Sequence, residues 1–327
     1  MSYHVHDYFT SGPDIVGEIN PTTRIFVVCV WEALVPDQEF LARFYSKPNP
    51  ITLVLNSWAK HIPIDKRFDV FYIDFFLWRT YNEIVNKQKS FVNNSWNAES
   101  KQFLFLTGKP EKEHRIGLLY SLEQQGLTSR CVSSLFINEL NQDTCRQILG
   151  VDDKEFQRFV NKFNNSPDFV GLPTAASVHY GGIPYNVNLF QTKFRLISET
   201  HINSASPWIT EKTWITILNQ QPFLIAGDVR TCRKLNSFGY KTFDSALCCV
   251  YDTVANWPQR KTALLKNVEQ WLDTEYNFSA DVKHNYNTLI QQAKNNLTNW
   301  NNYCKSIGVE IDIDSVIDTT DPQPATI

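Results

Sequence analysis

Short apolar segments that alternate with helical segments are the feature that most constrains the fold of this chain. In the first hundred residues, strand-like apolar runs occur at 24–31, 51–58 and 68–78. A helix-like stretch spans 37–46, and the third apolar run leads into a helical pattern near 79–92. Strands that alternate with helices favour an open, mainly parallel sheet covered by helices. The N-terminal part is therefore predicted to form one α/β domain.

The alternation resumes after the polar segment 92–102, which has no periodicity and is predicted to be a linker. Further strands are predicted at 103–110, 131–136, 193–199 and 222–227; helices at 111–127, 152–164, 257–273 and 281–303; a long loop at 166–186; and a frayed tail after 318. The chain is thus expected to be an α/β protein with two Rossmann-like domains that face a cleft. The boundaries predicted are 1–100 and 101–275, with a C-terminal helix and tail at 276–327 that pack back on the first domain.

The composition excludes several classes of protein. The 327 residues are 43% hydrophobic and 20% charged, which is typical of a soluble globular protein with a core. A net charge of −3 lacks the excess of positive charge that marks non-specific nucleic-acid binding. Seven cysteines without a Cys-x-x-Cys pair favour buried thiols in a reducing compartment. The start of the sequence has no signal-peptide pattern, and the apolar runs are too short to span a bilayer, so a cytoplasmic location is expected.

The stretch ITEKTWITILNQQPFLIAGD, residues 209–228, carries the strongest sign of chemistry. Thr210 suits the N-cap of a helix, which places Glu211 and Lys212 in its first turn. A lysine there opposes the helix dipole, but it is favourable if a diphosphate binds to the free amide groups of the helix start. Glu211, together with Glu199 at the end of the preceding strand, could then accept hydrogen bonds from ribose hydroxyls. The alternative is a plain capping motif with Lys212 solvated on the surface.

This block resembles the nucleotide-sugar motif of the α1,3-fucosyltransferase family, which reads approximately Phe-x-x-Glu-Asn-Ser, then Tyr-Ile-Thr-Glu-Lys-x-Trp, then Val-Pro-Val-x-x-Gly. A similar block occurs in glycosyltransferases encoded by tailed phages. The resemblance implies a GT-B fold, a metal-independent inverting transfer, diphosphate binding by Lys212 and ribose binding by Glu211. The matching positions are Glu199, Trp208, Ile209, Thr210, Glu211, Lys212, Trp214, Pro222 and Gly227.

The same resemblance extends weakly to the segment TGKPEKEHR, which is similar to the strand–loop–arginine segment of the family. It implies that Arg115, and with less weight Lys109, also faces the diphosphate. The family's Asn-Ser is replaced by Thr200-His201 and its Tyr by Trp208, so the base and the sugar are not specified. His179 and Tyr180 lie in a Gly-rich segment that either lines the donor cleft or forms an ordinary loop.

An inverting transfer needs a carboxylate that accepts the proton of the acceptor hydroxyl. Glu32 follows the first apolar run of the N-terminal part and Asp74 lies inside the third; each is a candidate, although a structural role is favoured for each taken alone. The pair His4 and His6 could bind a metal, but an N-terminal tail is the simpler prediction. The Asp312–Asp314 segment has the spacing of a metal motif, yet a solvated loop is favoured there.

The sequence therefore predicts a glycosyltransferase that moves a sugar from a nucleotide-diphosphate donor to an acceptor hydroxyl, with the first domain on the acceptor side, the second on the donor side and no further cofactor. The acceptor could be a surface glycan or a lipid-linked sugar. It could also be a hydroxymethylated base of phage DNA, but the net negative charge of the chain disfavours binding to DNA. A catalytically inactive nucleotide- or glycan-binding module is the alternative from another class. A dehydrogenase is disfavoured because no Gly-x-Gly-x-x-Gly follows a strand.

Overall fold

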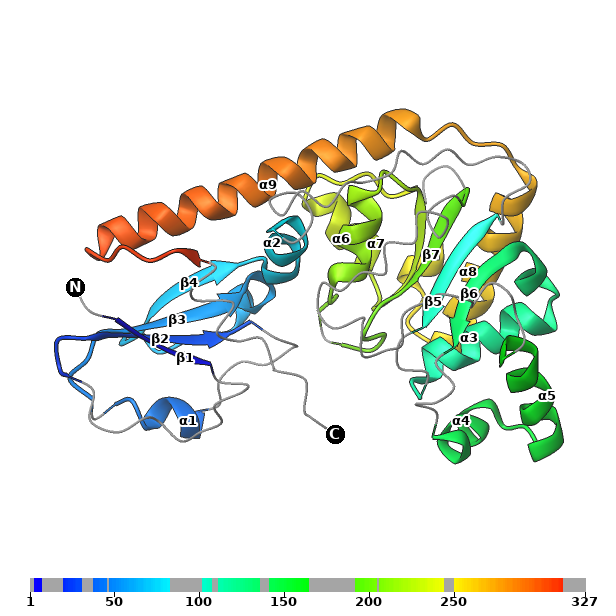
Figure 1. Cartoon of the computed structure of the whole chain (residues 1–327), viewed down its shortest axis with the longest axis horizontal. Coiled ribbons are helices and arrows are strands. Elements are labelled where there is room, and N and C mark those ends of the chain that lie inside the picture. The colour runs from blue at the N-terminus through cyan, green and yellow to red at the C-terminus, as the bar shows by residue number, and fades with distance from the viewer. Residues whose placement is uncertain are drawn as a thin grey trace. The chain divides into compact units, whose positions relative to one another are not determined.

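The chain is an α/β protein with two parallel four-stranded sheets, as predicted for two Rossmann-like domains (Figure 1). The computed structural model describes residues 3–7, 20–30, 38–45, 47–82, 102–107, 111–135, 141–164, 192–204, 206–243 and 250–313. Two compact units are present: Met1–Asn82 together with Ile290–Ile327, and Glu83–Leu289. The first unit is therefore built from both ends of the chain.

The first sheet has the order β1-β2-β3-β4, and all of its strand pairs are parallel. Its strands are β1 (Tyr3–Asp7), β2 (Arg24–Cys29), β3 (Ile51–Asn56) and β4 (Asp69–Ile73). The predictions for β2 and β3 are confirmed. The prediction of an N-terminal tail is wrong, because His4 and His6 lie in β1 and pair with Ile25 and Val27. An edge strand pairs with only one neighbour, so a short and mostly polar segment is sufficient to form it.

The third apolar run contains both a strand and the start of a helix. Strand β4 ends at Ile73, and α2 (Phe75–Tyr81) begins directly afterwards. Asp74 is the N-cap of α2, and its side chain accepts a hydrogen bond from the backbone amide of Leu77. The prediction had placed the helix further along, near 79–92, because the apolar residues continue without interruption through the cap. A single capping carboxylate therefore separates the two elements.

The two faces of the first sheet are covered by different parts of the chain. On one face, Phe40 and Phe44 from and just after α1 (Gln38–Ala42) join a cluster with Ile25 and Leu53. On the other face, Trp300 of α9 (Ser279–Ser306) packs against the rings of Phe26 and Phe71, with centroids 5.9 and 5.0 Å away. Successive strand residues point to opposite faces, so α1 covers the side chains of one face and α9 covers those of the other.

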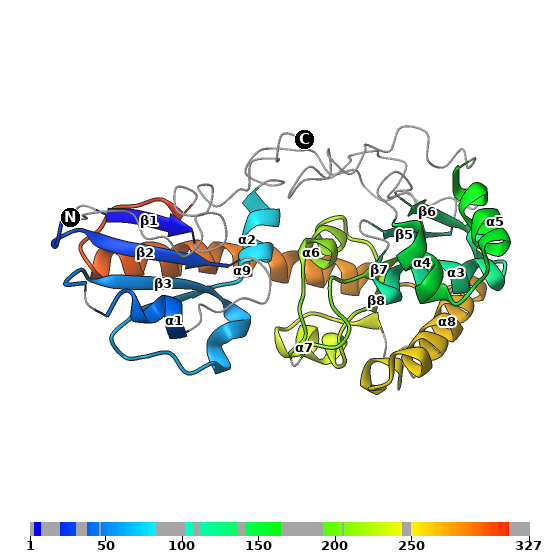
Figure 2. The ribbon, with the colours of Figure 1, turned by 90° about the horizontal axis from the view of Figure 1, so that it is seen from below.

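The second sheet has the order β6-β5-β7-β8, again with parallel pairs only (Figure 2). The strands β5 (Phe103–Thr107), β6 (Cys131–Leu135), β7 (Phe194–Ser198) and β8 (Phe223–Ala226) confirm the predictions. The chain moves from β5 to β6 in one direction across the sheet and from β7 to β8 in the other. The order of the strands thus reverses between β5 and β7.

The helices of the second unit follow its strands. The structure confirms the predictions of α3 (Glu113–Gln124), α5 (Asp153–Asn164), α6 (Glu211–Leu218) and α8 (Trp257–Asp273). It also confirms α9, whose residues are divided between the two units. Two short helices, α4 (Gln142–Leu149) and α7 (Thr231–Ser237), were not predicted. Short 3₁₀ helices occur at Leu127–Arg130 and Val250–Thr253 of this unit and at Ser57–His61 of the first unit. Helix α3 ends before Gly126, whose φ of 72° is the left-handed conformation that favours glycine.

The division between the two units falls inside α9. Its first half belongs to the second unit, where Asn285 exchanges hydrogen bonds of 2.7 and 2.8 Å with the backbone of Lys241. No described helix is both long and apolar enough to cross a membrane. The five cysteines within the described residues are buried. The predicted linker, the 166–186 loop and the C-terminal tail lie outside the described residues.

Candidate functional site

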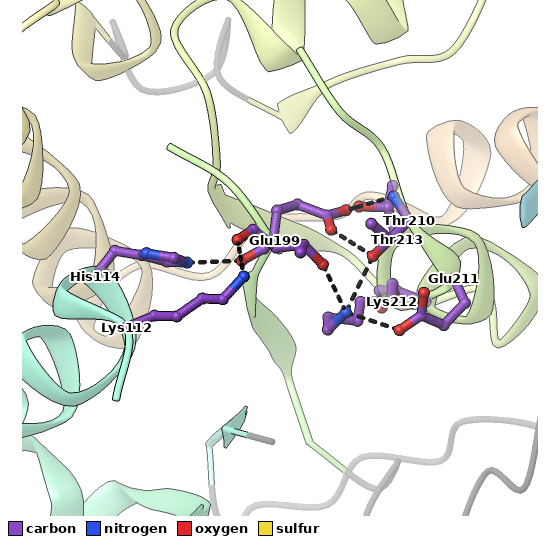
Figure 3. Close-up of polar contacts among 9 residues, drawn as sticks. Lys112, His114, Glu199, Thr210, Glu211, Lys212 and Thr213 are labelled. Carbon is purple, nitrogen blue, oxygen red and sulfur yellow. Dashed lines mark hydrogen bonds and ion pairs between the residues drawn. The ribbon is translucent and has the colours of Figure 1, made fainter. Parts of the chain in front are cut away.

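The carboxyl edge of the second sheet, between β5 and β7, is the candidate site. In open parallel sheets, ligands bind in the crevice outside the carboxyl ends of strands where the strand order reverses. Two side chains at the start of α3 reach across this point to the end of β7. His114 Nε2 donates to the carbonyl oxygen of Glu199 at 2.7 Å, and Lys112 Nζ donates to that of Thr200 at 2.9 Å (Figure 3). The two strand ends are thereby held together.

Glu199 is fully buried at the end of β7, and the chain itself uses both of its carboxylate oxygens. Oε1 accepts hydrogen bonds from the Thr210 amide at 3.2 Å and from the Thr213 hydroxyl at 2.6 Å. Oε2 accepts from the Thr210 hydroxyl at 2.5 Å. Burial outweighs the nearby Lys212 charge and these hydrogen bonds, so the pKa of Glu199 is raised. The carboxylate thus fixes the start of α6 and is not presented to solvent (Figure 3).

Thr210 occupies the predicted N-cap position of α6, but its side chain makes no capping hydrogen bond to the helix. The hydroxyl instead donates to Glu199, and its oxygen accepts from Lys212 Nζ at 3.1 Å. This differs from the predicted capping role because the hydroxyl oxygen, which a cap would offer to an amide, accepts from the Lys212 ammonium instead. The first-turn amides of α6 therefore donate no hydrogen bond to the cap side chain.

Lys212 lies in the first turn of α6 and is neither fully solvated nor deeply buried, with 22% of its side chain exposed. Its ammonium lies 2.7 Å from Glu211 Oε1 and 3.5 Å from the Thr200 hydroxyl. Burial opposes ionisation of Glu211, but the Lys212 charge and hydrogen bond, with a smaller effect of Arg115, lower its pKa. Glu211 is 35% exposed, so an ammonium and a carboxylate stand side by side within reach of solvent.

Two buried arginines add positive charge behind this pair. Arg115, in the first turn of α3, is 4% exposed; burial lowers its pKa, and the charges of Glu211 and Glu199 oppose that effect. Arg195, on the same face of β7 as Glu199, is 6% exposed; burial lowers its pKa to about 10, against the same two carboxylates. Both guanidinium groups stay charged at neutral pH. The candidate site therefore has a positive environment.

His114 does not contribute to this charge. Burial, followed by the nearby positive charges of Arg115, Lys112 and His201, lowers the pKa of His114 to about 3, although its hydrogen bond to the Glu199 carbonyl acts in the opposite sense. The imidazole is therefore neutral at physiological pH and carries its proton on Nε2, which donates to that carbonyl. Its role is to connect α3 with β7.

Gly227, which follows β8, has a packing reason for lacking a side chain. A Cβ at this position would lie 3.0 Å from the Thr231 hydroxyl, 3.2 Å from Ile225 Cγ2 and 3.5 Å from Glu199 Cβ. The next residue, Asp228, is 1% exposed, and its carboxylate accepts hydrogen bonds from the backbone amides of Ser204 and Trp208. Asp228 and Lys112 were not among the predicted site residues. A charged residue directly after a buried strand was the available signal for Asp228.

The other predicted site residues have varied positions. Trp208 is 3% exposed and is connected to the site through its backbone amide, which donates to Asp228. Asp74 caps α2 in the first unit. Glu32, Lys109 and Tyr180, together with His179, lie outside the described residues. Within the residues that the structure describes, no group of three or more metal-binding side chains comes together.

Comparisons with protein-family models, with curated proteins and with solved structures find no match for this chain.

Proposed function

We propose that the carboxyl edge of the second sheet binds the diphosphate of a nucleotide sugar and that the protein is a glycosyltransferase. The observation that carries this proposal is Lys212. It is a partly exposed lysine in the first turn of a helix, at the point of the sheet where the strand order reverses. A positive side chain is unfavourable at this end of a helix dipole unless an anion also binds there. The motif resemblance of residues 199–227 supports the same assignment.

The surrounding groups suit each part of such a donor. The first-turn amides of α6 and the Lys212 ammonium would bind phosphate oxygens, and Arg115 would add positive potential from behind. Glu211, ionised and 35% exposed, would accept hydrogen bonds from ribose hydroxyls. Binding would draw Lys212 away from Glu211, which leaves that carboxylate free to accept the hydroxyl protons. The ligand would therefore replace an ion pair that the chain makes with itself.

In the proposed reaction, the acceptor oxygen attacks the anomeric carbon and the bond to the diphosphate oxygen breaks. The departing diphosphate gains negative charge, and pre-oriented amides and cations stabilise that charge. A carboxylate of the N-terminal part takes the acceptor's proton; Asp74 and Glu32 are the predicted candidates for this step. The class of acceptor stays the prediction made from the sequence, a glycan or a lipid-linked sugar before a modified DNA base.

The donor site is tested by thermal shift and calorimetry with GDP, UDP, ADP, CDP and dTDP. We expect at least one nucleotide to raise the melting temperature, since a ligand at a hundred times its Kd stabilises by about 2.7 kcal/mol. Lys212→Gln should weaken that binding by about tenfold or more, because it removes a charge-assisted contact. Lys162→Gln is the matched control, since Lys162 forms an ion pair with Glu123 away from the site.

The proposal is wrong if none of the five nucleotides stabilises the protein, or if the Lys212 variant binds as tightly as the Lys162 variant. The corresponding sugar nucleotides then separate two outcomes. Slow release of the sugar in the presence of wild-type protein supports an enzyme. Tight binding of the sugar nucleotide without any release of its sugar supports a non-catalytic binding module.

A further inference from the structure

The loop between β7 and α6, residues 200–210, is attached to the rest of the second unit by charged side chains that bind its backbone. Lys112 donates to the carbonyl oxygen of Thr200 at 2.9 Å, and Arg260 of α8 donates to that of Ile202 at 2.6 Å. Lys234 of α7 donates to the carbonyl oxygen of Pro207 at 3.1 Å. Several elements distant in sequence therefore set the path of this loop, which a local turn motif would not require.

Asp228 contributes the central attachment. Its Oδ1 accepts the amide of Ser204 at 2.6 Å and its Oδ2 accepts the amide of Trp208 at 3.1 Å. The carboxylate is 1% exposed and follows β8, the strand that pairs with β7 on the side away from β5. Two residues after Trp208, the amide and hydroxyl of Thr210 bind Glu199. Two buried carboxylates thus hold the loop at three successive points before the helix begins.

We propose that Asp228 is a positioning residue for the candidate site, which fixes the 200–210 loop so that the first turn of α6 and Lys212 are held ready for an anion. This inference rests on the proposed function for its ligand, a nucleoside diphosphate. Asp228 itself contacts backbone amides and acts through Trp208 and Thr210. A carboxylate is required because both oxygens must accept, whereas an asparagine would offer one acceptor and place an NH₂ group against an amide N–H.

The functional consequence follows from geometry. Amide groups and an ammonium bind a phosphate well when their positions are fixed in advance, and a displacement of about 1 Å can cost roughly a hundredfold in a reaction that depends on them. Loss of one attachment would let the loop move and would carry Thr210 with it. We therefore expect the Asp228 variant to affect ligand binding more than its effect on stability would suggest.

The chain contains a matched control in Asp252. It also accepts two backbone amides, those of Cys232 at 3.0 Å and Arg233 at 3.2 Å, and it is 6% exposed. These two amides belong to the start of α7 and not to the 200–210 loop. Asp228→Asn and Asp252→Asn should lower stability by similar amounts, because each replaces a buried acceptor of two amides with an acceptor of one.

The experiment combines hydrogen–deuterium exchange of the free protein with calorimetric titration of GDP and UDP. In Asp228→Asn, we expect exchange to accelerate at least about tenfold in peptides covering 200–212, and nucleotide affinity to fall at least about tenfold. In Asp252→Asn, accelerated exchange should be confined to peptides covering 230–238, with affinity within about twofold of wild type. Lys234→Met, which removes a partly exposed attachment at Pro207, should show a weaker form of the Asp228 effect and folds even if Asp228→Asn does not.

Unchanged exchange of the 200–212 peptides in Asp228→Asn overturns the inference, as does an equal loss of affinity in the two aspartate variants. If Asp228→Asn does not fold, unchanged exchange in Lys234→Met has the same meaning. If wild-type protein binds neither nucleotide while the loop exchanges faster in Asp228→Asn, the proposed function fails but Asp228 is shown to hold the loop.

Discussion

The two sheets are built from the same kind of sequence, yet they differ in strand order, and this difference is the reason for placing the proposed ligand site on the second sheet. The first sheet runs β1-β2-β3-β4 in one direction, whereas the second reverses between β5 and β7. With right-handed crossovers, connections that run in opposite directions place their helices on opposite faces of the sheet. Different helices cover the two faces of the second sheet: Phe194 packs on Trp271 of α8, while Glu199, on the other face, binds α6.

A reversed order leaves a crevice between two adjacent strand ends, because the chain leaves them toward opposite faces. In the second sheet, the point of reversal is flanked by Lys112, by the backbone carbonyl groups of Glu199 and Thr200, and by the start of α6. In the first sheet, the order of the described strands contains no reversal. Polar groups at its carboxyl edge support the fold instead: Asp74 caps α2, and Asn56 donates to the carbonyl oxygen of Val30. The comparison supports the proposed ligand site at the second sheet and indicates a structural role for these polar groups of the first.

The largest expected effect comes from removing the aromatic centre of the first unit. Trp300 is fully buried, packs on Phe26 and Phe71, and donates from Nε1 to the carbonyl oxygen of Ile311 at 3.0 Å. Trp300→Ala should destabilise the first unit by about 3–5 kcal/mol, since it leaves a large cavity and an unsatisfied carbonyl. Urea denaturation followed by site-resolved hydrogen exchange measures this loss.

The matched variant is Trp271→Ala, which removes a 1% exposed indole from the second unit. We expect Trp300→Ala to leave nucleotide affinity within about twofold of wild type. Trp271→Ala should instead lower the stability of the second unit. If Trp300→Ala abolishes nucleotide binding while the second unit remains folded, ligand binding is not confined to the second sheet.

Glu199 gives the next largest effect and tests whether its carboxylate serves the fold. Glu199→Ala leaves the Thr210 amide and the hydroxyls of Thr210 and Thr213 without their acceptor, which should cost about 2–4 kcal/mol. Glu199→Gln keeps an oxygen for the amide and a donor for the Thr210 oxygen, so it should cost less. A ribose-binding role alone predicts equal and small changes in stability for both variants, as measured by thermal denaturation.

The pH dependence of Glu199 has a defined sign. The folded-state pKa lies above the ordinary value of 4.5, so the folded protein holds this proton more tightly than the unfolded chain does. Its contribution to stability is therefore fully present below about pH 4.5 and declines as the pH rises through the folded-state pKa. The stability of wild type relative to Glu199→Gln should fall over that range. A difference that increases with pH would contradict a raised pKa.

The smallest expected effect concerns Asp74 in the first sheet. Asp74→Ala removes the N-cap of α2 and should cost about 1 kcal/mol, which thermal denaturation detects. Asp74→Asn retains a capping oxygen and should be nearly neutral in stability. If Asp74 is also the proton acceptor of the proposed reaction, both variants lose sugar transfer. If Asp74→Asn retains full transfer, Asp74 is a cap alone.

Most strands and long helices could be predicted because their signals are local. β2, β3, β5 and β7 are short apolar runs bounded by polar residues, and α8 follows the periodicity of its apolar residues. Helix α7 was not predicted because it has no local capping side chain: its first amides donate to Asp252, about twenty residues later in the chain. Helix α4 buries only Cys145 and so lacks an apolar stripe.

The candidate site was predicted in part, for the same reason. Glu199, Glu211 and Lys212 lie within one stretch, and their spacing indicated that a strand end and a helix start meet. The use of Glu199 as an internal anchor was not visible, because it depends on how deeply the loop packs. The attachments of Ser204 to Asp228 and of Ile202 to Arg260 join residues 24 and 58 positions apart. Such pairings follow from the tertiary fold alone.

The division of α9 between the two units has a consequence for how the protein is made. A ribosome releases residues 1–82 before the second unit, but the sheet they form receives Trp300 and Tyr303 only after residues 83–289 have been synthesised. Until then, the face that bears Phe26 and Phe71 is uncovered, while Glu83–Leu289 can already complete its own core. During translation, the unit that supplies residues 1–82 is therefore expected to complete its core after the second unit.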